Sequence, residues 1–222
     1  MPELYLIRHA QASFGAANYD VLSDLGHDQS FELGKALARQ GVTPDGLFIG
    51  AQRRHRETLE GIIKGMGRDP EQATIHAGLN EFDFKGLLDA HYANKPAPEN
   101  MHSERKSHFR TLRDTVLAWQ RDEIENPPET WADFARRVED ARQAIVDSGA
   151  KHVVAVSSGG AIGQMIAATL NAPSEQQIQL QLQMKNCAVN RFIFTPRNFF
   201  LHGFNETPHI TAENTEPLLT YS

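Results

Sequence analysis

The chain has very little cysteine and a deficit of basic charge. Its single cysteine, Cys187, cannot form an internal disulfide, which excludes a small secreted module built on disulfide bonds and favours a reducing compartment. The 28 acidic residues outnumber the 22 lysines and arginines, and the net charge is −6. This balance argues against a surface that binds nucleic acid or anionic lipid broadly. Any anion site must therefore be a local cluster of arginine.

The sequence also lacks a recognisable targeting or membrane-spanning segment. Its longest apolar stretch, from Val153 to Leu170, is interrupted by serine, glycine and glutamine residues. The first residues carry Glu3 and Arg8 too early for a signal peptide. A chain of 222 residues is long enough to bury a large core without disulfides. We expect a soluble, cytoplasmic protein with a single domain over residues 1–222.

Short apolar segments alternate with segments of helical periodicity along most of the chain. This alternation predicts an α/β fold, specifically a three-layer α/β/α sandwich around a mostly parallel sheet. The predicted strands are 3–7, 47–49, 73–77 and 152–156, with a closing hairpin of 189–195 and 199–204. The predicted helices begin at a Ser23 cap, near Gln52, at a Thr130 cap and after Gly160.

The middle of the chain departs from this alternation. Residues 83–130 are polar, and the stretches 95–100 and 126–128 are rich in proline and asparagine. One helix, from Ser103 to Glu123, is expected between these breaks. We interpret residues 83–130 as a helical lid inserted into the main domain, with a polar and generic surface.

Three polar features directly follow predicted strands: Arg8-His9, Arg53-Arg54 and residues 158–160. Ligands of such sheets bind at the carboxyl ends of the strands, so these features are expected to share one site. A guanidinium group matches two phosphate oxygens at once, and a histidine nitrogen can accept a phosphoryl group. Backbone N–H groups at the start of the helix after residue 160 would add uncharged donors. The pattern predicts a phosphate pocket.

Several short motifs occur in order along nearly the whole chain. They are Leu6-Ile7-Arg8-His9-Ala10, then Leu22-Ser23 with Gly26 and Gln29, Arg54 with Glu57-Thr58, Leu79-Asn80-Glu81, Val153 to Val156 with Gly159-Gly160, and Asn186-Cys187-Ala188-Val189. This order resembles the histidine phosphatase superfamily, also called the phosphoglycerate mutase-like family. The resemblance implies the same α/β fold and phosphoryl-transfer chemistry.

The resemblance also implies roles for individual residues. His9 would accept the phosphoryl group, Arg8 and Arg54 would clamp it, and Glu81 would protonate the leaving oxygen. Asp83 remains an alternative proton donor. No metal or other cofactor is implied. The further expected phosphate contacts are Ser13, Ser158 and Gly159.

Ser158, Ala10, Ala12 and Gly15 depart from the family pattern. Ser158 stands where the family has its second catalytic histidine, and a serine donates one neutral hydrogen bond without positive charge. Loss of one such preorganised donor typically lowers a rate by roughly 10²–10³. Ala10 replaces the glycine after Arg-His, which matters if that residue needs a positive φ. His209 or a lid histidine is a candidate replacement, whereas His55 is expected to be packed or exposed rather than catalytic.

Two functions follow from these residues. The first is a metal-independent phosphomonoesterase, slow or narrow in specificity, that acts on a small phosphorylated substrate through a phosphohistidine at His9. The alternative is a phospho-ligand-binding or regulatory protein that has lost turnover because of Ser158. A phosphoglycerate mutase is less expected, because it must hold donor and acceptor in fixed geometry. The expected partner is a small phosphorylated molecule, without nucleic acid or membrane; the sequence leaves the substrate and the oligomeric state open.

Overall fold

The computed structural model describes residues 1–13, 20–69, 72–98 and 105–221, and a six-stranded sheet runs through this part of the chain. The strand order is β3-β2-β4-β1-β5-β6. The first four strands in this order pair in parallel, and the last two are joined in antiparallel fashion. The strands are β1 (Glu3–Arg8), β2 (Gly46–Ile49), β3 (Thr74–Ile75), β4 (His152–Ser157), β5 (Val189–Thr195) and β6 (Asn198–Glu206).

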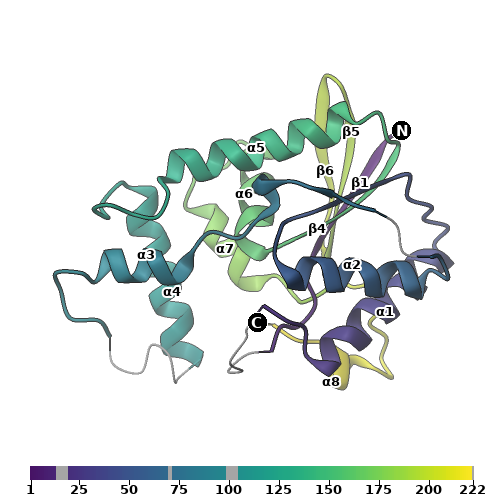
Figure 1. Ribbon diagram of the computed structural model, residues 1–222, viewed down its shortest axis with the longest axis horizontal. Coiled ribbons are helices and arrows are strands. Elements are labelled where there is room, and N and C mark those ends of the chain that lie inside the picture. Colours follow the sequence, from purple (N-terminus) through teal and green to yellow (C-terminus); the bar gives the residue numbers. More distant parts are fainter. Residues whose placement is uncertain (14–19, 70–71, 99–104, 222) are drawn as a thin grey trace.

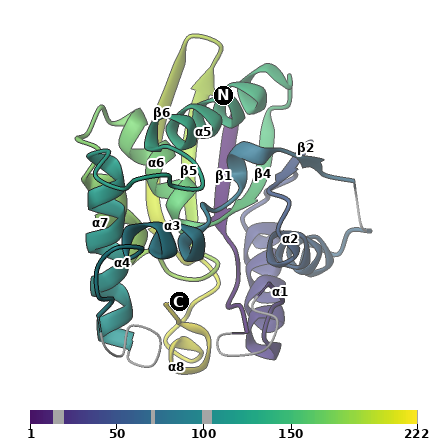
Figure 2. The ribbon, with the colours of Figure 1, turned by 60° about the vertical axis from the view of Figure 1, so that its left-hand side comes forward.

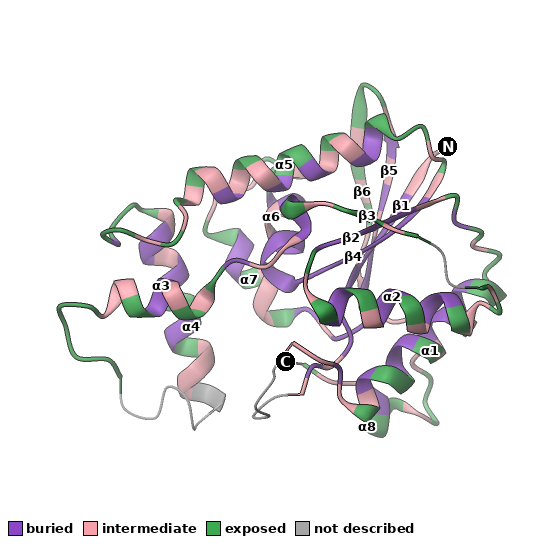
Figure 3. Ribbon diagram, in the orientation of Figure 1, coloured by how far each residue is buried: buried purple, intermediate pink, exposed green. Residues whose placement is uncertain are grey.

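Helices cover both faces of this sheet (Figures 1 and 2). Along β4, Val153 and Ala155 belong to one core cluster, whereas Val154 and Val156 belong to the other, as the period of two in a strand requires. Both faces of β4 are therefore buried, as Figure 3 shows, and the predicted α/β sandwich with a mostly parallel sheet is confirmed. One cluster includes α1 (Asp24–Arg39) and α2 (Arg53–Gly65); the other includes α5 (Trp131–Asp147) and α6 (Gly159–Thr169).

Two helices that pack on the sheet begin at the predicted caps. Ser23 Oγ accepts a hydrogen bond from the Gly26 N–H at 3.1 Å, and α1 starts at the next residue. Thr130 Oγ1 accepts from the Asp133 N–H at 3.1 Å in the same way at the start of α5. Beyond the end of α5, Gly149 has a φ of 78°, a conformation in which a side chain is strained. Local sequence thus sets where these helices start and stop.

The described part of segment 83–130 differs from its prediction in its helices. It contains two helices, α3 (Phe84–His91) and α4 (Arg105–Gln120), rather than one, and the predicted start at Ser103 lies outside the described residues. The segment also contributes to the core, because Leu112, Val116 and Trp119 are buried in the same cluster as residues of α5. These residues recur every three or four positions, so α4 presents an apolar face to the body of the protein. The division into domain and lid stays a prediction.

Three other short elements were not predicted: a 3₁₀ turn at Ala77–Leu79, α7 (Gln176–Gln183) and α8 (Thr215–Leu218). α7 packs beside α6, and α8 lies against α1. Within the described part of the chain, no helix has both the length and the apolar character needed to cross a bilayer.

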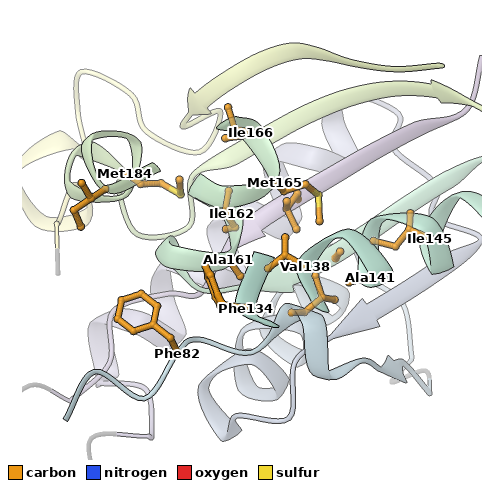
Figure 4. Packing of buried hydrophobic residues seen from close by; sticks show 14 of the residues in the cluster. Phe82, Phe134, Val138, Ala141, Ile145, Ala161, Ile162, Met165, Ile166 and Met184 are labelled. Carbon is orange, nitrogen blue, oxygen red and sulfur yellow. The ribbon is translucent and has the colours of Figure 1, made fainter. Parts of the chain in front are cut away.

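The larger core packs apolar side chains of α5 and α6 together, and the rings of Phe82 and Phe134 belong to it (Figure 4). The ring of Phe134 is fully buried, with its centroid 5.7 Å from that of Phe82 and 5.3 Å from that of Trp119. Replacing Phe134 with alanine should lower the free energy of unfolding by about 3–5 kcal/mol, because a cavity is left in a closely packed core. Urea denaturation followed by circular dichroism measures this loss.

The matched control is Phe200→Ala, since Phe200 is 61% exposed on β6. It should change the unfolding free energy by less than about 0.5 kcal/mol. Equal losses for the two variants would contradict the assignment of the core.

Candidate active site

Sheet order brings the three predicted polar features together. β4 lies between β1 and β2, so the residues that follow these strands meet at one edge of the sheet. Arg8 ends β1, Arg54 lies in the first turn of α2, and Ser158 is the residue before the first turn of α6. All three side chains are buried, and so is His9. Figure 1 shows α2 and α6 starting at the same end of the central strands.

The two guanidinium groups are held by different partners. Nη1 of Arg54 forms an ion pair with Asp20 Oδ1 at 2.7 Å, while its Nη2 donates to Ser158 Oγ at 3.2 Å. Nη1 of Arg8 donates to the backbone carbonyl of Met184. A Cβ built on Gly159 would lie 3.8 Å from Arg8 Nε, which places this guanidinium against the start of α6. Fixed guanidinium groups of this kind suit an oxyanion.

The environment of His9 favours a neutral, nucleophilic imidazole. Burial lowers the pKa of His9 well below its ordinary value, and the charges of Arg54 and Arg8 lower it further. Nδ1 of His9 lies 2.8 Å from the carbonyl oxygen of Ala10. Since a carbonyl can only accept, Nδ1 carries the proton, and the lone pair is on Nε2. This tautomer can form a bond to phosphorus.

Glu81 has the opposite shift. Burial raises the pKa of its carboxyl group, although the Gly160 N–H and the two arginines oppose the shift. Oε2 of Glu81 accepts from the Gly160 N–H at 3.0 Å, and a Cβ on Gly160 would lie 2.1 Å from Oε1. This backbone donor, expected to face phosphate, therefore serves the carboxyl group instead. Asp83, the alternative proton donor, caps α3 by accepting from the Gly86 N–H at 2.9 Å, and the choice between the two carboxyl groups stays a prediction.

Several motif residues position the loop that follows β1. The Ala10 N–H donates to Thr58 Oγ1 at 3.0 Å, and Thr58 donates to the carbonyl of Arg54 at 2.7 Å. The Gln11 N–H donates to the buried Gln29 side chain at 2.9 Å. A Cβ at Gly26 would lie 2.2 Å from the Gln11 carbonyl, so only glycine fits there. The motif at 22–29 and the threonine after Arg54 thus hold the backbone around His9.

The remaining expected residues have less direct positions. Ser13 is partly exposed, its N–H donates to the Val21 carbonyl at 2.9 Å, and its contact with phosphate stays a prediction. Gly159 is buried, and its contact with phosphate also stays a prediction. Ala10 is buried and is absent from the residues with positive φ, so alanine fits there without backbone strain.

One histidine of the site was missed by sequence reasoning, and so was Asp20, the ion-pair partner of Arg54. His55 is fully buried, as the expectation of a packed residue allowed, but its Nε2 lies 2.7 Å from Ser158 Oγ. Its ring centroid is 5.8 Å from that of His9. Burial lowers the pKa of His55 well below its ordinary value, Arg54 adds to this, and the backbone of Gly50 opposes it. The signal available in the sequence was its place next to Arg54, at the start of the helix that follows β2.

His209, a predicted replacement for the second histidine, lies elsewhere. It is buried near Glu32 of α1, and neither ring nitrogen has a hydrogen-bond partner within the described residues. The imidazole next to Ser158 is that of His55 instead. In the same part of the chain, no three His, Cys, Asp or Glu side chains are grouped so that they could hold a metal ion.

The chain is similar to known phosphatases and mutases. Residues 4–207 match the family described as histidine phosphatase superfamily (branch 1). A 2,3-bisphosphoglycerate-dependent phosphoglycerate mutase from Sphingopyxis alaskensis is 34% identical over 116 residues, which cover 48% of this chain and 51% of the mutase. The match thus spans about half the length of that relative.

Solved structures share the fold over nearly the whole chain. The crystal structure of phosphoglycerate mutase from Bacillus anthracis has a TM-score of 0.66 and 16% identity, and the alignment covers 94% of both chains. The alpha-ribazole phosphatase from Shigella flexneri has a TM-score of 0.66 and 19% identity, with 92% of this chain and 96% of that chain covered. At these identities the likeness shows the fold alone.

The buried imidazole of His209 makes stability depend on pH. Burial lowers its pKa to about 4 from an ordinary value of 6.5, although Glu32 opposes the shift. Between these two values the unfolded chain binds the proton and the folded chain does not. The contribution of His209 to the free energy of unfolding is therefore fully present above pH 6.5. It falls as the pH drops toward 4, by at most about 3 kcal/mol.

The variant His209→Leu should reduce this dependence, because leucine fills the site and does not titrate, whereas His9 and His55, whose pKa values burial also lowers, titrate in both proteins. Urea denaturation at pH 7.5 and pH 5 measures the difference between the two proteins. The same loss on acidification in both would contradict the assignment.

Proposed function

The chain belongs to the histidine phosphatase superfamily (branch 1), and from this premise we propose that it is a phosphomonoesterase acting through a phosphohistidine at His9. The supporting observation is the neutral imidazole of His9 among two buried guanidinium groups, with a carboxyl group of raised pKa at the start of α6. Arginine charges can neutralise a phosphoryl group without a metal ion. The proposed reaction is therefore metal-independent.

The proposed reaction has two steps. In the first, the Nε2 lone pair of His9 forms the bond to phosphorus, the bond from phosphorus to the leaving oxygen breaks, and Glu81 gives its proton to that oxygen. In the second, water attacks phosphorus while the Glu81 carboxylate takes its proton. The bond from phosphorus to nitrogen breaks and the lone pair returns to His9. Arg8 and Arg54 bind the non-bridging oxygens throughout.

The proposed substrate is a small phosphorylated molecule, and we propose neither nucleic acid nor membrane as a partner. The net charge of −6 supports this choice, because the positive charge of the site is local. The related solved proteins include a ribazole phosphatase and a phosphoglycerate mutase, whose named ligands are small phosphorylated molecules. A cytoplasmic location is part of the same proposal.

A second function is favoured by one observation. Ser158 is a neutral residue at the start of α6, and the imidazole beside it has a lowered pKa, so this flank of the site has less positive charge than the arginine flank. A protein with this pocket can bind a phosphorylated ligand and turn it over slowly or not at all. Phosphoglycerate mutase activity is less favoured, because two substrates must then be positioned in a site with a neutral flank.

The first prediction for this function concerns His9. Purified protein should release phosphate from a small aryl phosphate in the presence of EDTA, and His9→Ala should abolish the release because no other acceptor is proposed. A colorimetric phosphate assay measures both rates. Equal rates would sink the phosphohistidine mechanism. A rise of the melting temperature with vanadate, without turnover, would identify the binding protein instead.

Adjacent arginines provide a matched pair for the second prediction. Arg54 is buried in the site, whereas the side chain of Arg53 is 62% exposed and pairs with Glu57. Arg54→Ala should lower kcat/KM for the aryl phosphate by roughly 10²–10³, as expected for loss of one preorganised donor. Arg53→Ala should change it less than about twofold. Comparable losses in both variants would show that general positive charge, rather than the site geometry, is responsible.

A further inference from the structure

The hydroxyl group of Ser158 is surrounded by donors. Arg54 Nη2 donates to Ser158 Oγ at 3.2 Å, and His55 Nε2 lies 2.7 Å from the same oxygen. The three side chains come from two elements, since Arg54 and His55 open α2 and Ser158 precedes α6. All three are buried, so water does not compete for these contacts.

The protons on His55 and Ser158 limit which hydrogen bonds the Ser158 hydroxyl can make at the same time. A serine oxygen has two lone pairs and one proton. Arg54 uses one lone pair. If His55 carries its proton on Nε2, it uses the second, and the Ser158 proton is then available to a third group. If the proton of His55 is on Nδ1, the Ser158 hydroxyl must donate its proton to Nε2. Ser158 then has no proton left to donate to a ligand. The tautomer of His55 therefore decides whether Ser158 can donate into the pocket.

The geometry of His55 is compatible with the first tautomer. Its Nδ1 lies beside Gly50, where an added Cβ would be 2.4 Å away, and no hydrogen bond of acceptable geometry is made by this nitrogen within the described residues. A proton on Nδ1 thus gains only a contact with the Gly50 backbone that does not meet hydrogen-bond geometry, whereas a proton on Nε2 reaches the Ser158 oxygen. An oxyanion in the pocket adds a strong acceptor for the freed hydroxyl proton.

We propose that His55 is a positioning residue that acts through Ser158. With an oxyanion bound, the Nε2–H of His55 donates to Ser158 Oγ, and the Ser158 hydroxyl donates to an oxygen of the phosphoryl group. The pair supplies a neutral donor at position 158, the place where the sequence lacks a histidine. The inference rests on the phosphate site proposed above, but it concerns oxyanion binding and stands even if turnover is absent.

Replacements of His55 test the inference by binding rather than by activity. His55→Gln keeps an N–H donor near the position of Nε2, whereas His55→Leu fills the space without a donor. Titration calorimetry with inorganic phosphate should show affinity about tenfold or more weaker for His55→Leu, and most of the affinity recovered in His55→Gln. Arg53→Ala, outside the site, is the matched control.

Ser158→Ala supplies the second half of the test. If His55 acts through Ser158, the double variant His55→Leu with Ser158→Ala should bind phosphate no more weakly than Ser158→Ala alone. If the double variant loses affinity by the product of the two single losses, the two residues act separately. Equal affinity of wild type and His55→Leu would show that His55 has no role in phosphate binding.

Melting curves of each variant establish that it is folded. If His55→Leu does not fold, His55→Gln and Ser158→Ala still carry the comparison. Wild-type protein that binds no phosphate would also overturn the inference.

Nuclear magnetic resonance gives an independent readout. In protein with ¹⁵N-labelled histidine and saturating phosphate, His55 should show the Nε2–H tautomer and His9 the Nδ1–H tautomer, with His55→Gln used to assign the signal. An Nδ1–H tautomer for His55 in the phosphate complex would overturn the relay. Phosphate binding and this tautomer without any phosphate release would contradict the proposed enzyme and leave the relay intact.

Discussion

The burial of two guanidinium groups beside one imidazole is the constraint on which the site depends. Removing a charge from water is costly unless polar partners replace the solvent. Asp20 and Ser158 are such partners for Arg54, and the Met184 carbonyl is one for Arg8. Burial is the main reason that His9 stays neutral, and the same positive field adds to it, because a proton on the ring would add a third charge. Anion binding and nucleophilic character therefore both depend on charged groups held out of water.

This constraint also accounts for the residues around the site. The arginines cannot shift without exposing charge, so the backbone that presents them must be rigid. β1 and β4 pair along their whole length, and the carbonyl of Ser157 accepts from the His9 N–H at 2.9 Å. Thr58 links the loop after β1 to the first turn of α2. Most residues of the sequence motifs therefore hold the backbone around the site and do not themselves contact a ligand.

The sequence was sufficient for features that depend on local chemistry. Strand alternation, the Ser23 and Thr130 caps and the closing hairpin were predicted correctly, because each is specified within a few residues. α7 was not predicted, because its run of alternating glutamines has little apolar periodicity. This helix is placed by its packing against α6. The contact of His55 with Ser158 joins residues 103 positions apart, and only the pairing of β2 with β4 brings them together. Sheet order is a tertiary property that no local pattern specifies.

A neutral donor at position 158 is physically consistent with the charges already present. A protonated imidazole there would be a further positive charge next to Arg54, in a buried environment where such repulsion is strong. A hydroxyl group supported by the neutral His55 adds a directed proton without that cost. The consequence is weaker stabilisation of charge that develops during transfer, since neutral hydrogen bonds are about half as strong as charged ones. The arginines must then carry most of that stabilisation.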